Sequence, residues 1–240
     1  MGFVVAVDGP AGSGKGTITK LVGEKRNLVY IDTGAMYRCV TLDCIENGVD
    51  YTDIEGINKI LDKISIELKI ENGIQKVYLN GKDVSKEIRE NRVNSLVSKY
   101  SVIKEVRDKI TPMQQQMGNT QDIIMEGRDI CTVVFPNADV KIYLVCSVEE
   151  GAKRRYKQNL EKGINETYEN ALKNVKERDE IDSHREIAPL KKAEDAILID
   201  STNMTIEEVV NRVLEIIDET KRKKGLINWK THTIKSKGIL

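Results

Sequence analysis

A glycine-rich turn between a strand and a helix constrains this chain more than any other feature of its sequence. Phe3–Val7 is a short apolar run typical of a buried strand, and helical spacing of apolar residues follows from Ile18 to Val22. The segment between them, residues 8–17, reads DGPAGSGKGT. Such a turn directs backbone N–H groups into one concavity at a helix N-terminus, where amides and helix dipole bind polyphosphate. The turn therefore predicts a nucleoside triphosphate site.

The end of this turn indicates the kind of enzyme. Lys15 supplies a cation that can reach the β- and γ-phosphates. The next position, where the general motif has Ser or Thr for Mg²⁺, is Gly16, and a hydroxyl follows only at Thr17. We therefore expect Mg²⁺ to be held by Thr17, by water, or by both. The Gly-Lys-Gly-Thr variant resembles small-molecule and nucleotide kinases more than GTPases or motor ATPases.

Composition and charge narrow the class of protein. A chain of 240 residues can bury one core and still carry an insertion. Lys+Arg and Asp+Glu both total 38, and this zero net charge disfavours a general nucleic-acid binder. Residues 221–240 contain basic side chains and no acid. We predict a disordered basic tail over residues 225–240, with a contact to nucleic acid or ribosome as the alternative.

The cysteines and the apolar runs indicate the cellular location of the protein. The four cysteines form no CxxC pair and have no zinc-ligand spacing, so they indicate reduced thiols of a cytosolic protein. No secretory leader opens the chain, and its longest apolar runs have only the length of strands. We therefore expect a cytoplasmic protein that does not span a membrane. Nothing in the sequence demands an oligomer, so we expect a monomer.

Apolar runs that alternate with helical stretches predict an α/β fold. Continuous β-branched runs fit strands buried on both faces, and intervening helices imply right-handed crossovers and a parallel sheet. Two helices begin with capping-box patterns, Ser147–Glu150 and Thr205–Glu208. We predict a five-stranded parallel sheet flanked by helices, with ligands at the carboxyl ends of its strands. After Phe3–Val7, the predicted strands are Leu28–Ile31, Ile123–Met125, Val140–Cys146 and Ala196–Ile199.

One segment departs from this pattern. Ile64–Ile70 alternates strictly between apolar and polar residues, which is typical of a half-buried strand. Asn72-Gly73 and Asn80-Gly81 then separate two further short runs, and both dipeptides favour hairpin turns. We predict a small antiparallel insertion over residues 63–95, between core segments 1–62 and 96–224.

Arginines after two of the strands indicate a second anion site. Arg38 follows a polar turn in which Thr33 could cap a helix, and Arg128 stands beside Asp129 after the third strand. Forked guanidinium groups suit bidentate capture of phosphate. Two such arginines at equivalent strand ends, opposite the glycine-rich turn, favour a phosphate-bearing acceptor over solvated surface charges.

Residues about 153–190 have the features of a lid. Arg154 and Arg155 lie on one predicted helix, and Arg178 to Arg185 end the next, with a polar loop over residues 158–165 between them. Such a lid would exclude water from the transferring phosphoryl group, the alternative being a solvated helical hairpin. We assign no proton transfer to His184, which we expect to make a structural hydrogen bond.

The motifs together resemble the bacterial-type cytidylate kinase family of nucleoside monophosphate kinases. The resemblance covers residues of about 3 to 220 and rests on segments 8–17, 32–38, 126–136, 178–185 and 188–190. It implies an ATP-binding site, an insertion that closes on the acceptor nucleotide, and catalysis by alignment and cations. The ATP-binding residues would be Gly9, Pro10, Ala11, Gly12, Ser13, Gly14, Lys15, Gly16 and Thr17. The CMP-binding residues would be Thr33, Arg38, Ser98, Arg107, Arg128, Asp129, Arg178, Asp182 and Arg185. The catalytic residues would be Lys15, Arg128, Arg154, Arg155, Arg178 and Arg185.

The resemblance also assigns roles within the acceptor site. Arg38 and Arg128 would hold the acceptor phosphate, Asp129 with Ser98 would read the cytosine edge, and Asp182 with Arg178 would bind the sugar. A carboxylate accepts from the cytosine amino group, whereas uracil presents a carbonyl there and is repelled. We therefore expect Mg²⁺-dependent phosphorylation of CMP and dCMP by ATP, in pyrimidine nucleotide metabolism. The alternatives are a related kinase of UMP, AMP or a shikimate-like acceptor, and a nucleotide-binding regulator.

Overall fold

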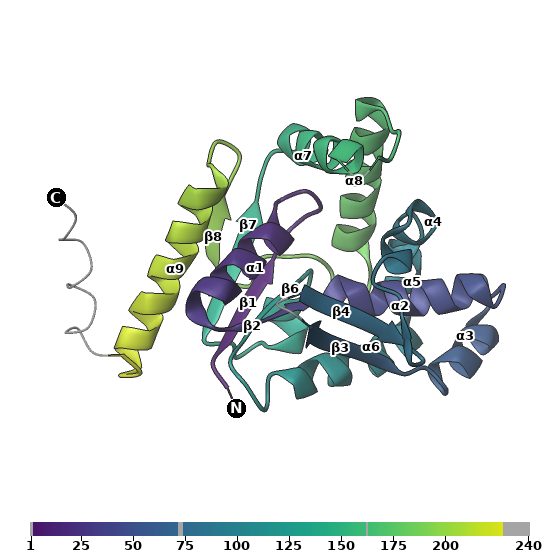
Figure 1. Cartoon of the computed structure of the whole chain (residues 1–240), viewed down its shortest axis with the longest axis horizontal. Helices are drawn as coiled ribbons and strands as arrows, with labels where there is room; N and C mark the ends of the chain where they lie inside the picture. The colour runs from purple at the N-terminus through teal and green to yellow at the C-terminus, as the bar shows by residue number, and fades with distance from the viewer. Residues whose placement is uncertain (1, 72–73, 162, 228–240) are drawn as a thin grey trace.

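A parallel sheet forms the centre of the molecule. The computed structural model describes residues 2–71, 74–161 and 163–227 of the chain. The five strands are all parallel and lie in the order β2-β6-β1-β7-β8 (Figure 1). Each begins and ends within one or two residues of a predicted run, so the predicted fold class is confirmed. The strands are β1 (Val4–Asp8), β2 (Val29–Asp32), β6 (Ile123–Gly127), β7 (Val140–Val145) and β8 (Ile197–Asp200).

The central strand β1 is buried on both faces, which explains its continuous apolar run. Val5 and Val7 belong to the apolar cluster that contains residues of helices α1 (Lys15–Arg26) and α9 (Ile206–Lys223). Val4 and Ala6 point to the opposite face, where they pack with residues of the π-helical turn η2 (Ile130–Val134). Successive side chains of a strand alternate between faces, so covering both faces requires apolar residues at every position.

A second layer contains the predicted insertion. Strands β3 (Ile66–Glu71), β4 (Ile74–Leu79) and β5 (Lys82–Asp83) form an antiparallel sheet, as predicted. Asn80 and Gly81 both have positive φ, at 50° and 82°, as a type I′ hairpin turn requires. The Asn72-Gly73 dipeptide lies outside the described residues.

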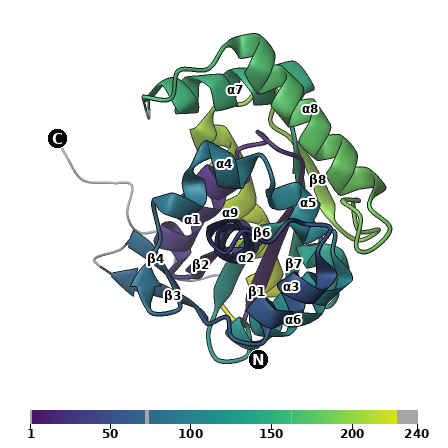
Figure 2. The same ribbon diagram turned by 90° about the vertical axis from the view of Figure 1, so that its right-hand side faces the viewer.

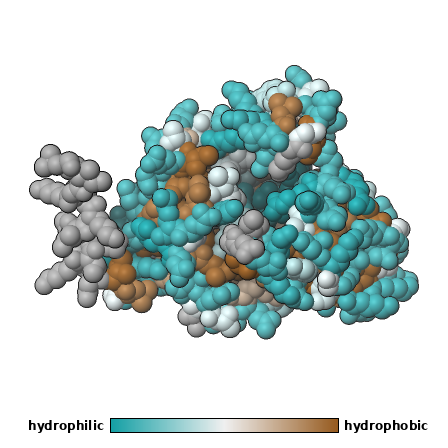
Figure 3. Space-filling view, in the orientation of Figure 1, coloured by the Kyte–Doolittle hydropathy of each residue, from teal (hydrophilic) through white to brown (hydrophobic). Residues whose placement is uncertain are grey.

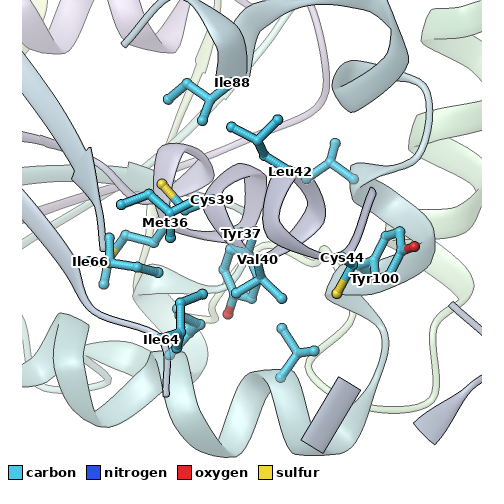
Figure 4. Packing of buried hydrophobic residues seen from close by; sticks show 14 of the residues in the cluster. Met36, Tyr37, Cys39, Val40, Leu42, Cys44, Ile64, Ile66, Ile88 and Tyr100 are labelled. Atoms are coloured by element: carbon cyan, nitrogen blue, oxygen red, sulfur yellow. The ribbon is translucent and has the colours of Figure 1, made fainter. Parts of the chain in front are cut away.

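The insertion shares its hydrophobic core with the helix that follows β2. Ile66 pairs with Leu79 across the hairpin, and both belong to one cluster with Met36 and Val40 of this helix. Figure 4 shows Ile66 beside Met36 in this cluster. The small sheet is therefore anchored to the core of the molecule rather than held by its own hydrogen bonds alone. The surrounding helices are α2 (Thr33–Glu46), α3 (Ile54–Leu61), η1 (Glu87–Arg89), α4 (Asn91–Asn94), α5 (Val97–Ser101) and α6 (Lys104–Met117).

Two helices, together named the lid below, lie above the carboxyl ends of the sheet strands (Figures 1 and 2). They are α7 (Val148–Glu161) and α8 (Tyr168–His184), and they pack along each other with Tyr156 edge-on to Tyr168. The predicted polar loop over 158–165 starts too early, because α7 continues to Glu161. Asn159 in this last turn is buried and donates a hydrogen bond to Glu166, an interaction that its polar sequence did not reveal.

Two predicted helix starts need correction. Asp32 caps α2 instead of Thr33: its carboxylate accepts from Ala35 N at 3.2 Å, whereas the Thr33 hydroxyl donates to the Glu126 carbonyl at 2.6 Å. At α7 only half of the capping box forms. Glu150 N donates to Ser147 Oγ at 3.2 Å, but the Glu150 carboxylate binds a lid arginine instead of returning to the Ser147 N–H. The capping box at the start of α9 is complete, as predicted.

The predicted basic tail lies outside the described residues from position 228 onward. Within the part of the chain that the structure describes, every helix is too short or too polar to cross a membrane.

Candidate active site

A cavity of about 1480 Å³ opens at the carboxyl ends of the parallel strands. It lies between the sheet, the insertion and the lid, and Figure 3 shows the hollow between the upper lobe, which carries the lid, and the lobe at the right. Most residues that the sequence singled out line it. They are Ala11 to Thr17, Thr33, Arg38, Ser98, Arg128, Asp129, Arg154, Arg155, Arg178, Asp182 and Arg185. Arg107 instead lies behind Asp129.

The donor loop, residues 9–17, runs from the end of β1 into the first turn of α1. Residues 11–17 form one side of the cavity, whereas the predicted ATP-binding residues Gly9 and Pro10 are not part of its lining. Gly14 stands at the N-cap of α1 with φ 88°, a conformation that favours glycine. Gly12 has φ 76°, and a Cβ there would lie 2.6 Å from the Gly151 carbonyl oxygen of α7. The loop is therefore closely covered by the first turn of the lid.

Lys15 lies within the donor loop. Its ammonium donates to the carbonyl oxygens of Gly9 and Pro10, both at 2.7 Å, and to Ser13 Oγ at 3.2 Å. Burial, together with the nearby charge of Arg128, lowers the pKa of Lys15 to about 7. The cation is thus held in a dry position where an added anion would raise its pKa.

Glu126, at the end of β6, was not predicted as a site residue. A Cβ at position 16 would lie 2.8 Å from Glu126 Oε1, so this carboxylate lies directly against Gly16. Tyr30 donates its hydroxyl proton to the same oxygen at 2.7 Å. Thr17 lies exposed in the cavity wall. Mg²⁺ prefers one or two protein oxygens together with phosphates and water, so a hydroxyl and a carboxylate beside the donor loop fit this ion.

Opposite the donor loop lies an arginine cluster made of Arg38, Arg128, Arg155 and Arg178. The Nε atoms of Arg38 and Arg178 are buried and meet no hydrogen-bond acceptor among the described residues. Burial, with the charges of Arg128 and Arg155, lowers the pKa of Arg178 to about 9. Buried donors with unmatched positive charge form a strong binding site for an anion such as phosphate.

Carboxylates hold the arginine cluster in position. Arg128 Nε donates to Asp182 at 2.9 Å, and Arg38 donates to Asp32 at 2.7 Å. Arg89, a cation of the insertion that the sequence did not single out, contacts Asp32 at 3.2 Å. Burial alone would raise the pKa of Asp32, but the two arginines outweigh it and lower the pKa.

Asp129 is buried between two further arginines. Arg107 donates to one carboxylate oxygen and Arg185 contacts the other at 3.4 Å. The turn that follows Asp129 is fixed by Asp8, which accepts from Ile130 N at 2.9 Å and Cys131 N at 2.7 Å. Burial raises the pKa of Asp8 to about 6. Sequence reasoning noted Asp8 only as part of the glycine-rich motif, because its partners lie more than a hundred residues away.

The lid arginines divide between the two halves of the cavity. Arg154 donates to Ser201 O at 2.8 Å and to Ser13 O at 3.4 Å, so it lies on the donor loop. Arg155 instead belongs to the arginine cluster, where Arg38 and Arg128 help to lower its pKa after burial. His184, as expected, makes a local hydrogen bond, to the Glu180 carbonyl at 3.1 Å.

Comparisons with known proteins agree with this geometry. A family profile described as cytidylate kinase matches residues 5–219. The cytidylate kinase of Fusobacterium nucleatum is 51% identical over 219 residues, covering 91% of this chain and 99% of the relative. That of Bacillus subtilis is 45% identical, covering 91% and 97%. A solved structure of an uncharacterized protein from Eubacterium ventriosum, 12% identical with a TM-score of 0.50 over 91% of this chain and 99% of the other, shares the fold alone.

Proposed function

Because the chain belongs to the cytidylate kinase family, we propose that it transfers the γ-phosphoryl group of ATP to CMP and dCMP. One observation supports this most directly: a backbone-lined donor loop and a buried arginine cluster face each other across one cavity. Each half suits a phosphate group, and the product would be CDP or dCDP with ADP. We further propose that the protein acts as a monomer in the cytoplasm, in pyrimidine nucleotide metabolism.

On the donor side, the amides of residues 12–17 and the dipole of α1 would bind the ATP phosphates. Lys15 would bridge the β- and γ-phosphates, leaving its present carbonyl partners in the loop. Thr17 and Glu126, which both line the cavity, would hold Mg²⁺, and the ion would supply charge neutralisation between the phosphates.

On the acceptor side, Arg38 and Arg128 would hold the phosphate of CMP. Asp129 and Ser98 would face the cytosine edge, and Asp182 with Arg178 would bind the sugar. Asp129 can accept from the cytosine amino group, because Arg107 and Arg185 hold its carboxylate in place. Uracil presents a carbonyl at this position and would be repelled.

Transfer itself would need alignment and positive charge more than a general base. The acceptor phosphate is already anionic near neutral pH, and cations stabilise the charge that spreads over the transferring group. Lys15, Arg128, Arg154, Arg155, Arg178 and Arg185 are the cations that we assign to this task. The lid helices α7 and α8, with the rest of the segment predicted as a lid (residues about 153–190), and the insertion over 63–95 would close over the substrates and exclude water.

The test is a coupled ADP-release assay with ATP, Mg²⁺ and each of CMP, dCMP, UMP, AMP and GMP. We expect strong turnover with CMP and dCMP and weak turnover with UMP. Preference for UMP or AMP would replace the proposed acceptor. Turnover with none of the five would overturn the proposal and leave only the donor site.

A further inference from the structure

Tyr30 and Glu126 form a hydrogen-bonded pair on neighbouring strands at the donor side of the cavity. Tyr30 of β2 is in register with Ile124 of β6, so Glu126, two residues further along β6, lies on the same face of the sheet. The tyrosine side chain reaches across this offset, and its hydroxyl donates to Glu126 Oε1 at 2.7 Å. Both residues line the cavity.

Packing fixes the body of the Tyr30 side chain. Its ring is partly buried against the apolar cluster that the sheet forms with helices α1 and α9. A Cβ at Gly23 of α1 would lie 3.6 Å from Tyr30 Cβ, so the helix backbone passes close over the base of the side chain. A tyrosine has only two rotatable side-chain bonds, and this packing therefore determines where its hydroxyl lies.

The pair lies where the general phosphate-loop motif carries a hydroxyl. That motif has Ser or Thr for Mg²⁺ at the position of Gly16. A Cβ at Gly16 would lie 2.8 Å from Glu126 Oε1 and 3.5 Å from Tyr30 Oη. The carboxylate and the phenol therefore take the space in which a side chain of residue 16 would stand.

Tyr30 uses only one of the two oxygens of Glu126. Within the part of the chain that the structure describes, Glu126 Oε2 makes no hydrogen bond and no ion pair. A carboxylate that binds a metal is commonly oriented by a hydrogen bond from a neighbouring group, and Mg²⁺ demands near-ideal ligand geometry. Resting on the function proposed above, we propose that Tyr30 is a positioning residue of the donor site: its hydroxyl holds the Glu126 carboxylate beside Gly16, where Oε2 binds Mg²⁺ in place of the hydroxyl of the general motif.

This role predicts a result that a purely structural bond does not. If the hydrogen bond only joined β2 to β6, its loss would change nucleotide binding by the same factor with and without Mg²⁺. If the bond positions a Mg²⁺ ligand, its loss weakens binding of the Mg²⁺ complex alone. The ratio of the two affinities thus decides between the two roles.

The experiment is isothermal titration calorimetry of the full chain with AMP-PNP, once with Mg²⁺ and once with EDTA. Tyr30→Phe keeps the ring and removes only the hydroxyl. We expect its affinity for Mg²⁺·AMP-PNP to fall about tenfold, the lower end of the range for a lost hydrogen-bond partner of a metal ligand. Its affinity for metal-free AMP-PNP should stay within about twofold, because the hydroxyl contacts the carboxylate and not the nucleotide.

Tyr78→Phe is the matched control. The Tyr78 hydroxyl donates to Glu71 Oε1 at 2.8 Å on the surface of the insertion, so the same substitution removes the same kind of bond outside the cavity. Both affinities of this variant should stay within about twofold. An equal fall of both affinities in Tyr30→Phe, no change in either, or the same loss in Tyr78→Phe would overturn the proposal.

Glu126→Gln tests whether Tyr30 acts through the carboxylate. This substitution removes the proposed Mg²⁺ ligand, so the ratio of the two affinities should no longer depend on the Tyr30 hydroxyl. Adding Tyr30→Phe to Glu126→Gln should change the ratio less than about twofold. A further fall of about tenfold in the double variant would mean that Tyr30 acts on another group and would contradict the proposal. Thermal melts confirm that affinities are compared between folded proteins.

The binding measurement needs no acceptor, so the two proposals can fail separately. Protein that shows the expected change of ratio but does not phosphorylate CMP contradicts only the proposed function. Protein that phosphorylates CMP and whose Tyr30→Phe variant keeps the ratio contradicts only the positioning role.

Discussion

The two halves of the cavity hold charge in different ways. The donor loop is one continuous segment, and Lys15 finds all its partners within six residues along the chain. The acceptor half is assembled from side chains that are distant in sequence: Arg107 and Asp129 lie 22 residues apart, and Arg89 and Asp32 lie 57 apart. One half therefore depends on local backbone geometry, and the other on the tertiary fold.

This difference determines what each substitution should disturb. A site built from backbone groups keeps its shape when a single side chain is removed. Substitutions in the donor loop should therefore lower the catalytic rate and leave the free energy of unfolding nearly unchanged. A network of buried ion pairs keeps an uncompensated charge when one member is removed. Substitutions in the acceptor half should therefore also lower the free energy of unfolding. Kinetic and stability measurements on variants of each half therefore separate the two.

The largest effect is expected for Lys15→Met. Loss of the cation near the transferring phosphoryl group should lower kcat/KM on the order of 10³-fold, with all acceptors affected equally. Affinity for CMP should change less than about twofold, because the acceptor half does not use Lys15. Steady-state kinetics and calorimetry with CMP measure both. The control is Lys25→Met, at an exposed site near the end of the same helix. Loss of CMP binding in Lys15→Met would contradict the independence of the donor and acceptor halves.

Next in size is Arg128→Lys. Lysine keeps the charge but loses the forked geometry that holds both a phosphate and Asp182, so the KM for CMP should rise on the order of 10²-fold. Affinity for Mg²⁺·AMP-PNP should stay within about twofold. Arg92→Lys, at an exposed pair with Glu90, provides the same exchange outside the cavity. An equal loss of AMP-PNP affinity would mean that Arg128 serves both halves.

Asp129→Asn should affect selectivity and stability together. Replacing the carboxylate removes the preference for an amino group, and the CMP/UMP ratio of kcat/KM should fall about tenfold. It also leaves Arg107 and Arg185 without their counter-charge, at a cost of about 3–5 kcal/mol in the free energy of unfolding. Urea denaturation and steady-state kinetics with both nucleotides measure the two effects.

Asp129→Asn combined with Arg107→Met tests the origin of the stability loss. The double variant removes one unpaired charge and should regain part of the lost stability. A folded Asp129→Asn variant with unchanged CMP/UMP selectivity would remove Asp129 from base reading.

Local patterns in the sequence were sufficient for the fold and for the donor loop. The five buried strands show as apolar runs, and the Asn80-Gly81 turn needs positive φ at two successive residues, which its composition reveals. The donor loop is recognisable because its partners are its own neighbours. The family assignment from the motifs was confirmed by the comparisons.

Long-range pairing in the site could not be predicted in the same way. Ser147–Glu150 and Thr205–Glu208 are equivalent patterns, yet only the second forms a full capping box, because Arg154 takes the Glu150 carboxylate. Glu126 contacts the donor loop only through the folded arrangement, from an element far along the chain. Its carboxylate carries no local signature that separates it from a solvated surface charge.

The smallest expected effect, proton uptake, separates the halves by their titration. Lys15 has a pKa lowered to about 7, so at pH 8 most of it is neutral, and an adjacent triphosphate should raise its pKa. Binding of Mg²⁺·AMP-PNP should therefore take up close to one proton at pH 8 and only about a tenth of a proton at pH 6, where Lys15 is already charged. Binding of CMP should take up little in this range, because the arginines stay charged, even Arg178 with its pKa near 9.

Calorimetry in two buffers of different ionisation enthalpy measures the uptake, and Lys15→Met should abolish its rise towards pH 8. Uptake that persists in this variant would assign the titrating group elsewhere, and the donor half would then differ from the acceptor half in its connectivity but not in its proton chemistry.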